Sequence, residues 1–266
     1  MTDELLFHIS RAVIHLYQLG TPHADALARD LFNSSKPLAD AEAMQMELPA
    51  VPRVFLGIPT HDGRLHMRTA IAMRNAGIVC YPEITRGSLL PHIFNLLWHT
   101  AVSHGFDYFA MLHADMGANN QWLATMIHEL QQRQALIVSA HCGMKDGSGC
   151  VSTAYDDTAG QVHKLTPDDI QALPQTFNHA DLKGHQPAAL NLLLNTGCMV
   201  ADIRGDWARK VCFRFRTSCQ YDANGPVIDV DSEDWELSRD MFAWGLGDRI
   251  YATNAVETHH AGEAIY

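Results

Sequence analysis

Basic residues are scarce in this chain: 19 Lys and Arg stand against 30 Asp and Glu, for a formal net charge of −11. A nucleic-acid-binding surface has to neutralise phosphates with basic side chains, so the deficit argues against nucleic acid as a partner. Electrostatic docking on anionic lipid is disfavoured for the same reason. A ligand that carries phosphate groups would therefore need a metal ion to offset their charge.

Cysteine and long apolar stretches are also scarce. The six cysteines form neither a Cys-x-x-Cys pair nor a regular frame, which suits a reducing cytoplasm better than a disulfide scaffold and makes zinc a poor candidate. No stretch approaches the roughly 18 apolar residues that a membrane span needs, and no basic region precedes the first apolar residues. These absences predict a soluble, cytoplasmic protein without a transmembrane segment.

Several short motifs are missing as well. The 16 histidines include no His-Glu-x-x-His, which disfavours a zinc hydrolase. Gly-x-Gly-x-x-Gly and Gly-x-x-x-x-Gly-Lys-Ser/Thr are absent too. Their absence disfavours dinucleotide binding and ordinary P-loop nucleotide binding.

The composition and patterning that remain predict two parts. With 266 residues and 47% hydrophobic content, the chain can bury one substantial core. Apolar residues recur at helical spacing over residues 3–19, so we expect residues 1–50 to be a helical extension with a structural or oligomerising role. Pro49 and Pro52 mark its boundary because proline cannot continue a helix. Residues 51–266 are expected to form one catalytic domain.

Short apolar runs alternate with longer helical ones from Arg53 onward. This alternation predicts βαβ units and a largely parallel, buried sheet, that is, an α/β fold. Residues 143–149 and 156–186 lack periodicity and are expected to be loops, the second with one short helix over 167–172. The predicted strands are 54–58, 78–81, 109–112, 136–140 and 250–253, and the predicted helices are 67–75, 89–103 and 121–132.

Three motifs carry candidate chemistry. His113-Ala114-Asp115 follows an apolar run, at the carboxyl end of a predicted strand, where α/β sheets bind ligands. Glu233-Asp234 opens a helical pattern that continues to Arg239, and His259-His260-Ala261-Gly262 lies late in the chain. Two acidic motifs and a late histidine can together hold a divalent cation, a diphosphate and a catalytic base.

In this order, the three motifs resemble those of GT-A glycosyltransferases, in particular the large, mostly inverting family 2. The resemblance runs from about Arg53 to Tyr266. It implies a GT-A, Rossmann-like sheet, mixed but mostly parallel and flanked by helices. It also implies a nucleotide-diphosphate sugar as donor, an acceptor that the sequence does not identify, and Mn²⁺ or Mg²⁺ as cofactor.

The resemblance implies that Asp115 is a metal ligand together with His260 or His259. His260 is preferred because His260-Ala261-Gly262 fits the His-x-Gly pattern of the family. Hard oxygen donors suit Mg²⁺ or Mn²⁺, and a histidine shifts the preference toward Mn²⁺. Two structural alternatives stay open: Asp115 only caps a helix that begins near Asn120, or the histidines belong to an unstructured tail.

By the same resemblance Asp234 is the general base that accepts the proton of the acceptor hydroxyl, and Glu233 belongs to the catalytic set. A structural alternative is that Asp231 and Ser232 cap the helix while the two acidic residues meet its dipole. Arg239 is poorly spaced to share a helix face with Asp234, so it is expected to reach the sheet or a phosphate.

The residues expected to bind the nucleotide sugar follow the first three strands or precede a later one. His113 replaces the first Asp of the family motif, which puts its part in metal binding in doubt, and Phe94 stands where the family has Arg. Arg86 or His92 could supply the missing phosphate contact. The expected set is Thr60, His61, Asp62, Glu83, Arg86, Ser88, Asn95, His113 and Gly197.

The sequence therefore predicts a metal-dependent glycosyltransferase, inverting by resemblance. Two alternatives remain: a sugar-nucleotidyltransferase, and a sugar-nucleotide-binding protein whose catalytic set has decayed. A nucleotidyltransferase should have a Gly-rich, basic loop after its first strand, where this chain has Thr60-His61-Asp62-Gly63. The sequence leaves a homo-oligomer open.

Overall fold

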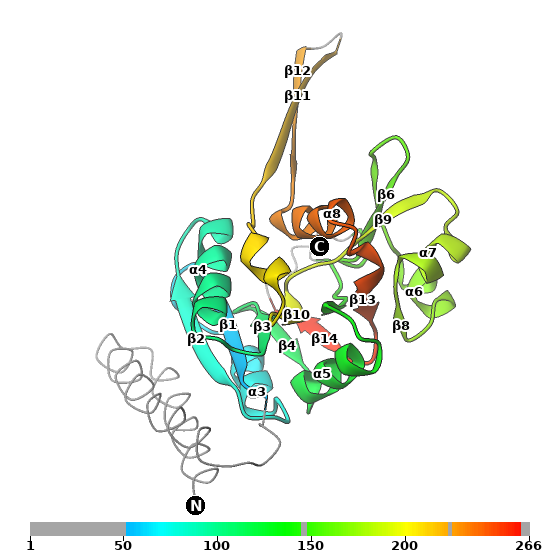
Figure 1. Cartoon of the computed structure of the whole chain (residues 1–266). Coiled ribbons are helices and arrows are strands. Elements are labelled where there is room, and N and C mark those ends of the chain that lie inside the picture. Colours follow the sequence, from blue (N-terminus) through cyan, green and yellow to red (C-terminus); the bar gives the residue numbers. More distant parts are fainter. Residues whose placement is uncertain (1–51, 145–147, 223–224, 262–266) are drawn as a thin grey trace, which may run out of the picture.

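In the computed structural model, the described residues are 52–144, 148–222 and 225–261 (Figure 1). The helical extension predicted over residues 1–50 lies outside them. The helices are α3 (Met67–Arg74), α4 (Leu90–Ser103), α5 (Trp122–Gln132), α6 (Pro167–Ala172), α7 (His179–His185) and α8 (Glu233–Ala243), with 3₁₀ turns η1 (Asp206–Lys210) and η2 (Gly247–Arg249). The strands are β1 (Val54–Thr60), β2 (Tyr81–Arg86), β3 (Tyr108–Leu112), β4 (Met116–Ala118), β5 (Ile137–Ala140), β6 (Ala154–Asp157), β7 (Val162–Lys164), β8 (Thr176–Phe177), β9 (Ala189–Leu193), β10 (Cys198–Asp202), β11 (Arg216–Asp222), β12 (Gly225–Asp231), β13 (Ile250–Thr253) and β14 (Thr258–His260).

A seven-stranded sheet with the order β2-β1-β3-β10-β5-β13-β8 forms the centre of the molecule. Strands β2, β1, β3, β5 and β13 point the same way, whereas β10 runs antiparallel to β3 and β5, and β8 runs antiparallel to β13. The fold is therefore α/β, with a mixed but mostly parallel sheet flanked by helices, as the alternating pattern predicts.

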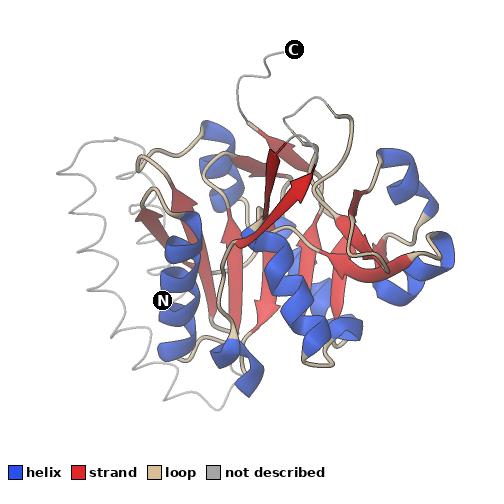
Figure 2. Ribbon diagram, turned by 90° about the horizontal axis from the view of Figure 1, so that it is seen from above, coloured by secondary structure: helices blue, strands red, loops and turns tan. Residues whose placement is uncertain are grey.

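Helices cover both faces of this sheet (Figure 2), which is why β1 is buried along its whole length. Phe55 and Trp98 of α4 belong to the buried cluster on one face, and Leu56 and Trp122 of α5 to the cluster on the other. Each indole N–H donates to a backbone carbonyl, at 2.8 Å for Trp98 and 2.9 Å for Trp122, so neither buried donor is left unpaired. Gly57 allows α4 to approach closely, because a Cβ there would lie 3.2 Å from Leu97.

Strand β2 begins later than the sequence predicts. The run 78–81 belongs mainly to the connection before β2, and Val79 is 42% exposed. The strand itself contains Pro82, which cannot donate to a neighbouring strand and is tolerated because β2 is at the edge of the sheet.

The stretch 156–186 is more ordered than the sequence predicts. The short helix α6 has the predicted bounds, but β7, β8 and α7 also lie in this stretch, and β6 reaches into it. Strands β7, β6 and β9 form a small antiparallel sheet. Apolar periodicity missed it because the inward-facing positions of β6 include the carboxylate of Asp156, which is buried.

Strands β11 and β12 form a two-stranded ribbon that projects from the body of the molecule just before α8 (Figure 1). Across the parts of the chain that the structure describes, no helix is both long and apolar enough to cross a bilayer.

Candidate functional site

The candidate site lies at the carboxyl ends of β1 and β3, where neighbouring strand ends are tied together by backbone hydrogen bonds. Ala114 N–H donates to Pro59 O at 3.3 Å, and His66 N–H donates to Ala114 O at 2.8 Å. On the other side of β3, His113 N–H donates to Gly197 O at 2.9 Å. Because β10 runs against its neighbours, the loop that precedes it arrives at this same edge.

The late histidines belong to a strand, so the alternative of an unstructured tail is wrong. Strand β14 pairs antiparallel with β4, which sets His260 opposite Met116, and Ala261 N–H donates to Asp115 O at 2.7 Å. The Nε2 atom of His260 lies 3.5 Å from Oδ2 of Asp115. His259 alternates to the other face, where its Nε2 lies 3.5 Å from Oε1 of Glu257.

The pair of Asp115 and His260 fits a divalent cation in its chemistry. The Asp115 side chain is 45% exposed and that of His260 27%, so an ion can reach both. The Nδ1 atom of His260 lies 3.4 Å from Gly143 O. With the proton on Nδ1, the Nε2 lone pair faces the carboxylate, an arrangement that a cation between them would stabilise.

Two donors are fewer than a closed metal site requires. Among residues 52–144, 148–222 and 225–261, no group of three or more His, Cys, Asp or Glu side chains could hold a metal ion. The Asp115 and His260 atoms are 3.5 Å apart, close to the spacing of about 3 Å between adjacent ligands of an octahedral ion. Most coordination positions would be left for ligands that the protein does not supply.

The capping alternative is wrong for Asp115, whereas for the helix that begins at Glu233 it is confirmed for Ser232 and for the acidic first turn. Helix α5 has Gln121 at its N-cap with no side-chain cap, so Asp115 caps no helix there. Helix α8 is capped by Ser232, whose Oγ accepts from Asp234 N–H at 3.4 Å. Asp231 does not share this role, because its carboxylate accepts from Arg239 at 2.8 Å.

The carboxylate of Asp234 connects to the strand-end motif through Thr196, which lies in the loop before β10. The Thr196 hydroxyl donates to Oδ1 of Asp234, and its oxygen lies 3.3 Å from Nε2 of His113. Burial, followed by the nearby charge of Glu233, raises the pKa of Asp234 to about 7. Burial also raises the pKa of Glu233.

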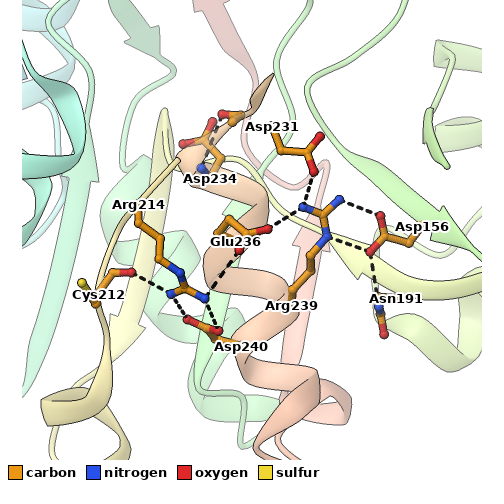
Figure 3. Close-up of polar contacts among 10 residues, drawn as sticks. Asp156, Asn191, Cys212, Arg214, Asp231, Asp234, Glu236, Arg239 and Asp240 are labelled. Carbon is orange, nitrogen blue, oxygen red and sulfur yellow. Dashed lines mark hydrogen bonds and ion pairs between the residues drawn. The ribbon is translucent and has the colours of Figure 1, made fainter. Parts of the chain in front are cut away.

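Arg239 occupies a buried network of acidic side chains (Figure 3). Its Nη2 donates to Asp156 of β6 at 2.9 Å, and its Nη1 donates to Asp231 at 2.8 Å and to Glu236 at 2.6 Å. The guanidinium therefore reaches the small sheet, one of the two expected destinations. Arg214 adds a second fork, with bonds of 2.6 and 2.8 Å to Asp240.

The residues predicted after β1 form a tight turn. The Thr60 hydroxyl accepts from Gly63 N–H at 3.1 Å and donates to Arg64 O at 3.1 Å. Asp62 accepts from Arg64 N–H at 2.9 Å, which lowers the pKa of its carboxyl. His61 and Asp62 are exposed at the strand end.

The residues predicted on and after β2 lie beside this turn. Arg86 is in register with Thr60 and is exposed, and its Cδ lies 3.6 Å from the position that a Cβ on Gly63 would take. Ser88 is exposed just beyond the strand. Glu83 lies earlier in β2, opposite Gly57, and is half-buried.

Asn95 is engaged in packing. Its Nδ2 donates to Phe213 O at 2.8 Å, and its Oδ1 accepts from Phe213 N–H at 2.9 Å, so both ends of the amide hold one backbone segment. The neighbouring Phe94 is buried, and its ring centroid lies 5.2 Å from that of His113. Where the family has Arg, this chain therefore places an apolar ring against the imidazole.

Gly197 lies in a confined place beside the same imidazole. A Cβ on Gly197 would lie 3.2 Å from Oδ1 of Asn195 and 3.9 Å from Nδ1 of His113. The Asn195 oxygen accepts from Gly197 N–H at 3.0 Å, while its Nδ2 donates to Ala140 O at 2.8 Å. The loop 195–197 is thereby fixed to β5 and presents Thr196 to the site.

No protein-family model matches the chain, and no curated protein matches it. Among solved structures, it is similar to A197 from STIV, with a TM-score of 0.49 and 10% identity over 80% of this chain and 87% of that one. It is also similar to GalNAc-T7, crystallised with UDP, GalNAc and Mn²⁺, with a TM-score of 0.49 and 10% identity. That match covers 80% of this chain but only 44% of GalNAc-T7. At such identities neither neighbour assigns an activity to the chain.

Proposed function

We propose that the chain is a metal-dependent, GT-A-like glycosyltransferase that transfers a sugar from a nucleotide-diphosphate sugar to an acceptor. The observation that carries the proposal is the convergence of Asp115 with His260 at 3.5 Å, at the strand edge that the hydroxyl of Thr196 links to Asp234. Asp115, Asp234 and His260 are far apart in the sequence. The pairing of β14 with β4 brings Asp115 and His260 together.

Asp115 and His260 are the residues that would hold the metal ion, Mn²⁺ or Mg²⁺. When bound, the ion would neutralise charge on the diphosphate and so stabilise the leaving group. Two protein donors leave room for phosphate oxygens in the coordination shell. The chain has few basic residues that could neutralise the diphosphate, which supports a role for a metal ion in doing so.

Asp234 would act as the general base. Its raised pKa, about 7, makes the carboxylate a stronger proton acceptor than an ordinary aspartate while leaving a large fraction ionised near neutral pH. The acceptor hydroxyl would give its proton to Asp234, its oxygen would bond to the anomeric carbon, and the bond from that carbon to the diphosphate oxygen would break. One direct displacement of this kind inverts the anomeric centre. Glu233 would support the step through its charge, which helps to raise the pKa of Asp234.

The donor would lie along the strand ends that meet Asp115. Residues of the turn after β1 and of β2 and its end would contact the nucleotide, and the strand-end imidazole and the glycine before β10 would border the sugar and phosphates. Asn95 is left out because its amide holds Phe213. The proposed set is Thr60, His61, Asp62, Glu83, Arg86, Ser88, His113 and Gly197.

A donor screen tests this function. UDP-, GDP- and CMP-sugars are each added with and without Mn²⁺, because a ligand specific to the folded state raises the apparent Tm. The binding donor is then incubated with candidate acceptors, and release of the nucleotide is measured. Binding that requires Mn²⁺, followed by acceptor-dependent release, is expected. Release of pyrophosphate from a nucleoside triphosphate would instead identify a nucleotidyltransferase.

A sugar-nucleotide-binding protein without turnover is the second candidate. It is favoured by Phe94 packing against His113 where the family has Arg, and by the two-donor metal pair. Metal-dependent donor binding without nucleotide release, across acceptors of several chemical classes, would support this candidate over the transferase.

A further inference from the structure

The ribbon formed by β11 and β12 presents an apolar face to solvent. Residues paired across two antiparallel strands share a face, and alternate pairs face the same way. The pairs on this face are Thr217 with Val230, Cys219 with Ile228 and Tyr221 with Pro226. All six residues are exposed, and the exposed fraction is 80% for Tyr221, 66% for Ile228 and 56% for Val230.

This face differs in charge from the molecule that carries it. None of its six residues is Asp, Glu, Lys, Arg or His, whereas the chain has a formal net charge of −11. Two copies of so acidic a protein repel each other over most of their surfaces, and least where charge is missing. A partner for the face has to be apolar and uncharged there, which is what the same face of a second copy offers.

The ribbon also lacks the support that short β-structure needs. Its two strands are not hydrogen-bonded to the other sheets in the described part of the chain. A lone two-stranded ribbon is marginally stable in water and gains stability when its apolar face is packed. We propose that two copies of this chain associate through these faces, ribbon against ribbon.

The ribbon has a centre that fixes how the two copies would lie. Each strand has seven residues, and Cys219 with Ile228 is the middle pair. A two-fold axis across the strands at this pair brings each Cys219 against its counterpart and sets each Tyr221 over the other Thr217. The two bodies then lie at opposite ends, so they do not collide.

The size of the face sets the strength of the dimer. Seven residues per strand span about 23 Å, so each copy buries a few hundred Å², short of the roughly 800 Å² per partner typical of stable complexes. The dimer is therefore weak and depends on concentration. It requires nothing of the proposed glycosyltransferase site, so the two proposals can fail separately.

Sedimentation velocity on the full chain, from roughly 1 to 100 µM, tests the proposal. We expect the weight-average sedimentation coefficient of the wild type to rise with concentration and that of Ile228→Asp to stay at the monomer value. Val79→Asp is the matched control, because Val79 is an exposed valine on the body, and it should dimerise like the wild type. Circular dichroism confirms that both variants fold. A wild type that stays monomeric, or dimers that Ile228→Asp leaves intact, would overturn the proposal.

Cross-linking locates the contact. A short bismaleimide should trap a wild-type dimer through Cys219, and Cys219→Ser should abolish it. Cys212 is also exposed but lies outside the ribbon, so Cys212→Ser should leave the cross-linked dimer in place. The opposite pattern would place the contact elsewhere. If a monomeric wild type instead floated with phosphatidylcholine vesicles, the face would serve a neutral lipid surface and the dimer would be wrong.

Discussion

The carboxyl group of Asp234 has a raised pKa of about 7 because it is partly desolvated and lies near the charge of Glu233. Asp234→Asn should lower kcat by on the order of 10² to 10⁴-fold with donor Kd nearly unchanged, since a base acts on the acceptor proton in the transition state. Single-turnover kinetics and calorimetry measure the two quantities. A variant that transfers sugar at the wild-type rate would leave Asp234 a purely structural role, and one that binds no donor would move it to the donor site.

The same raised pKa predicts how stability responds to pH. A carboxyl whose pKa is higher in the folded than in the unfolded state binds its proton more tightly when folded, so its contribution to stability is present at low pH and is lost as the pH rises toward about 7. Asp234→Asn cannot ionise. Its Tm relative to that of the wild type should therefore be higher at pH 8 than at pH 4, as measured by calorimetric scans at both pH values. A Tm difference that is the same at both would contradict the pKa.

Thr196 should act as a positioning residue for Asp234. Its hydrogen bond lowers the pKa of Asp234 against the effect of burial, so Thr196→Val should shift the rising limb of the pH profile of kcat/KM to higher pH. Thr196→Ser keeps the hydroxyl and should restore the wild-type profile. An unshifted profile in the valine variant, or a shifted one in the serine variant, would exclude this role.

Residue patterns predicted the acidic motifs and the late histidine but not the contact between Thr196 and Asp234. Asp115, Asp234 and His260 each lie in a short motif that can be recognised along the chain. No motif predicts the contact of Thr196 with Asp234, because it depends on β10 running antiparallel to β3 and so bringing its preceding loop to the strand ends. Asn95 fits its motif, yet only tertiary packing reveals that Phe213 occupies its amide.

The ion pairs of Arg239 stabilise the packing of helix α8 against the small sheet. The Arg239 side chain is 13% exposed, that of Asp156 is 7% and that of Glu236 is 8%. Arg239→Met would leave buried carboxylates unpaired and should lower the free energy of unfolding by about 3 to 5 kcal/mol. Urea denaturation measures the change. Arg204→Met is the control: Arg204 pairs with Asp202 but is 56% exposed, so its loss should cost at most about 1 kcal/mol. Equal losses in the two variants would contradict the role of burial.

Strand β14 places its two histidines on opposite faces, with His260 near Asp115 and His259 near Glu257. His260→Ala should weaken Mn²⁺-dependent donor binding by roughly tenfold or more, because only His260 lies beside Asp115. His259→Ala should leave that binding nearly unchanged. Calorimetry of the donor in Mn²⁺ compares the two, and an equal effect of both substitutions would exclude His260 as a specific ligand.

For the whole molecule, sequence periodicity predicted the α/β class but not the full topology. The apolar runs of β1 and β3 identify buried strands, and the longer helical runs between the strands identify α3 to α5. The sequence did not predict the small sheet of β6, β7 and β9 because its strands are short and bury the carboxylate of Asp156, which pairs with Arg239 far along the chain. Whether residues 1–50 are helical stays a prediction, as those residues lie outside the described structure.

In the proposed function, a metal ion held by Asp115 and His260 joins this acidic protein to a diphosphate. Calorimetry of UDP and GDP binding, in Mn²⁺ and in EDTA, tests it most directly. We predict binding at least roughly tenfold tighter in Mn²⁺, and loss of most of that difference in Asp115→Asn, which keeps the size of the side chain but removes its charge. Equal affinity of the wild type for the nucleotide in EDTA and in Mn²⁺ would contradict a metal-dependent diphosphate site.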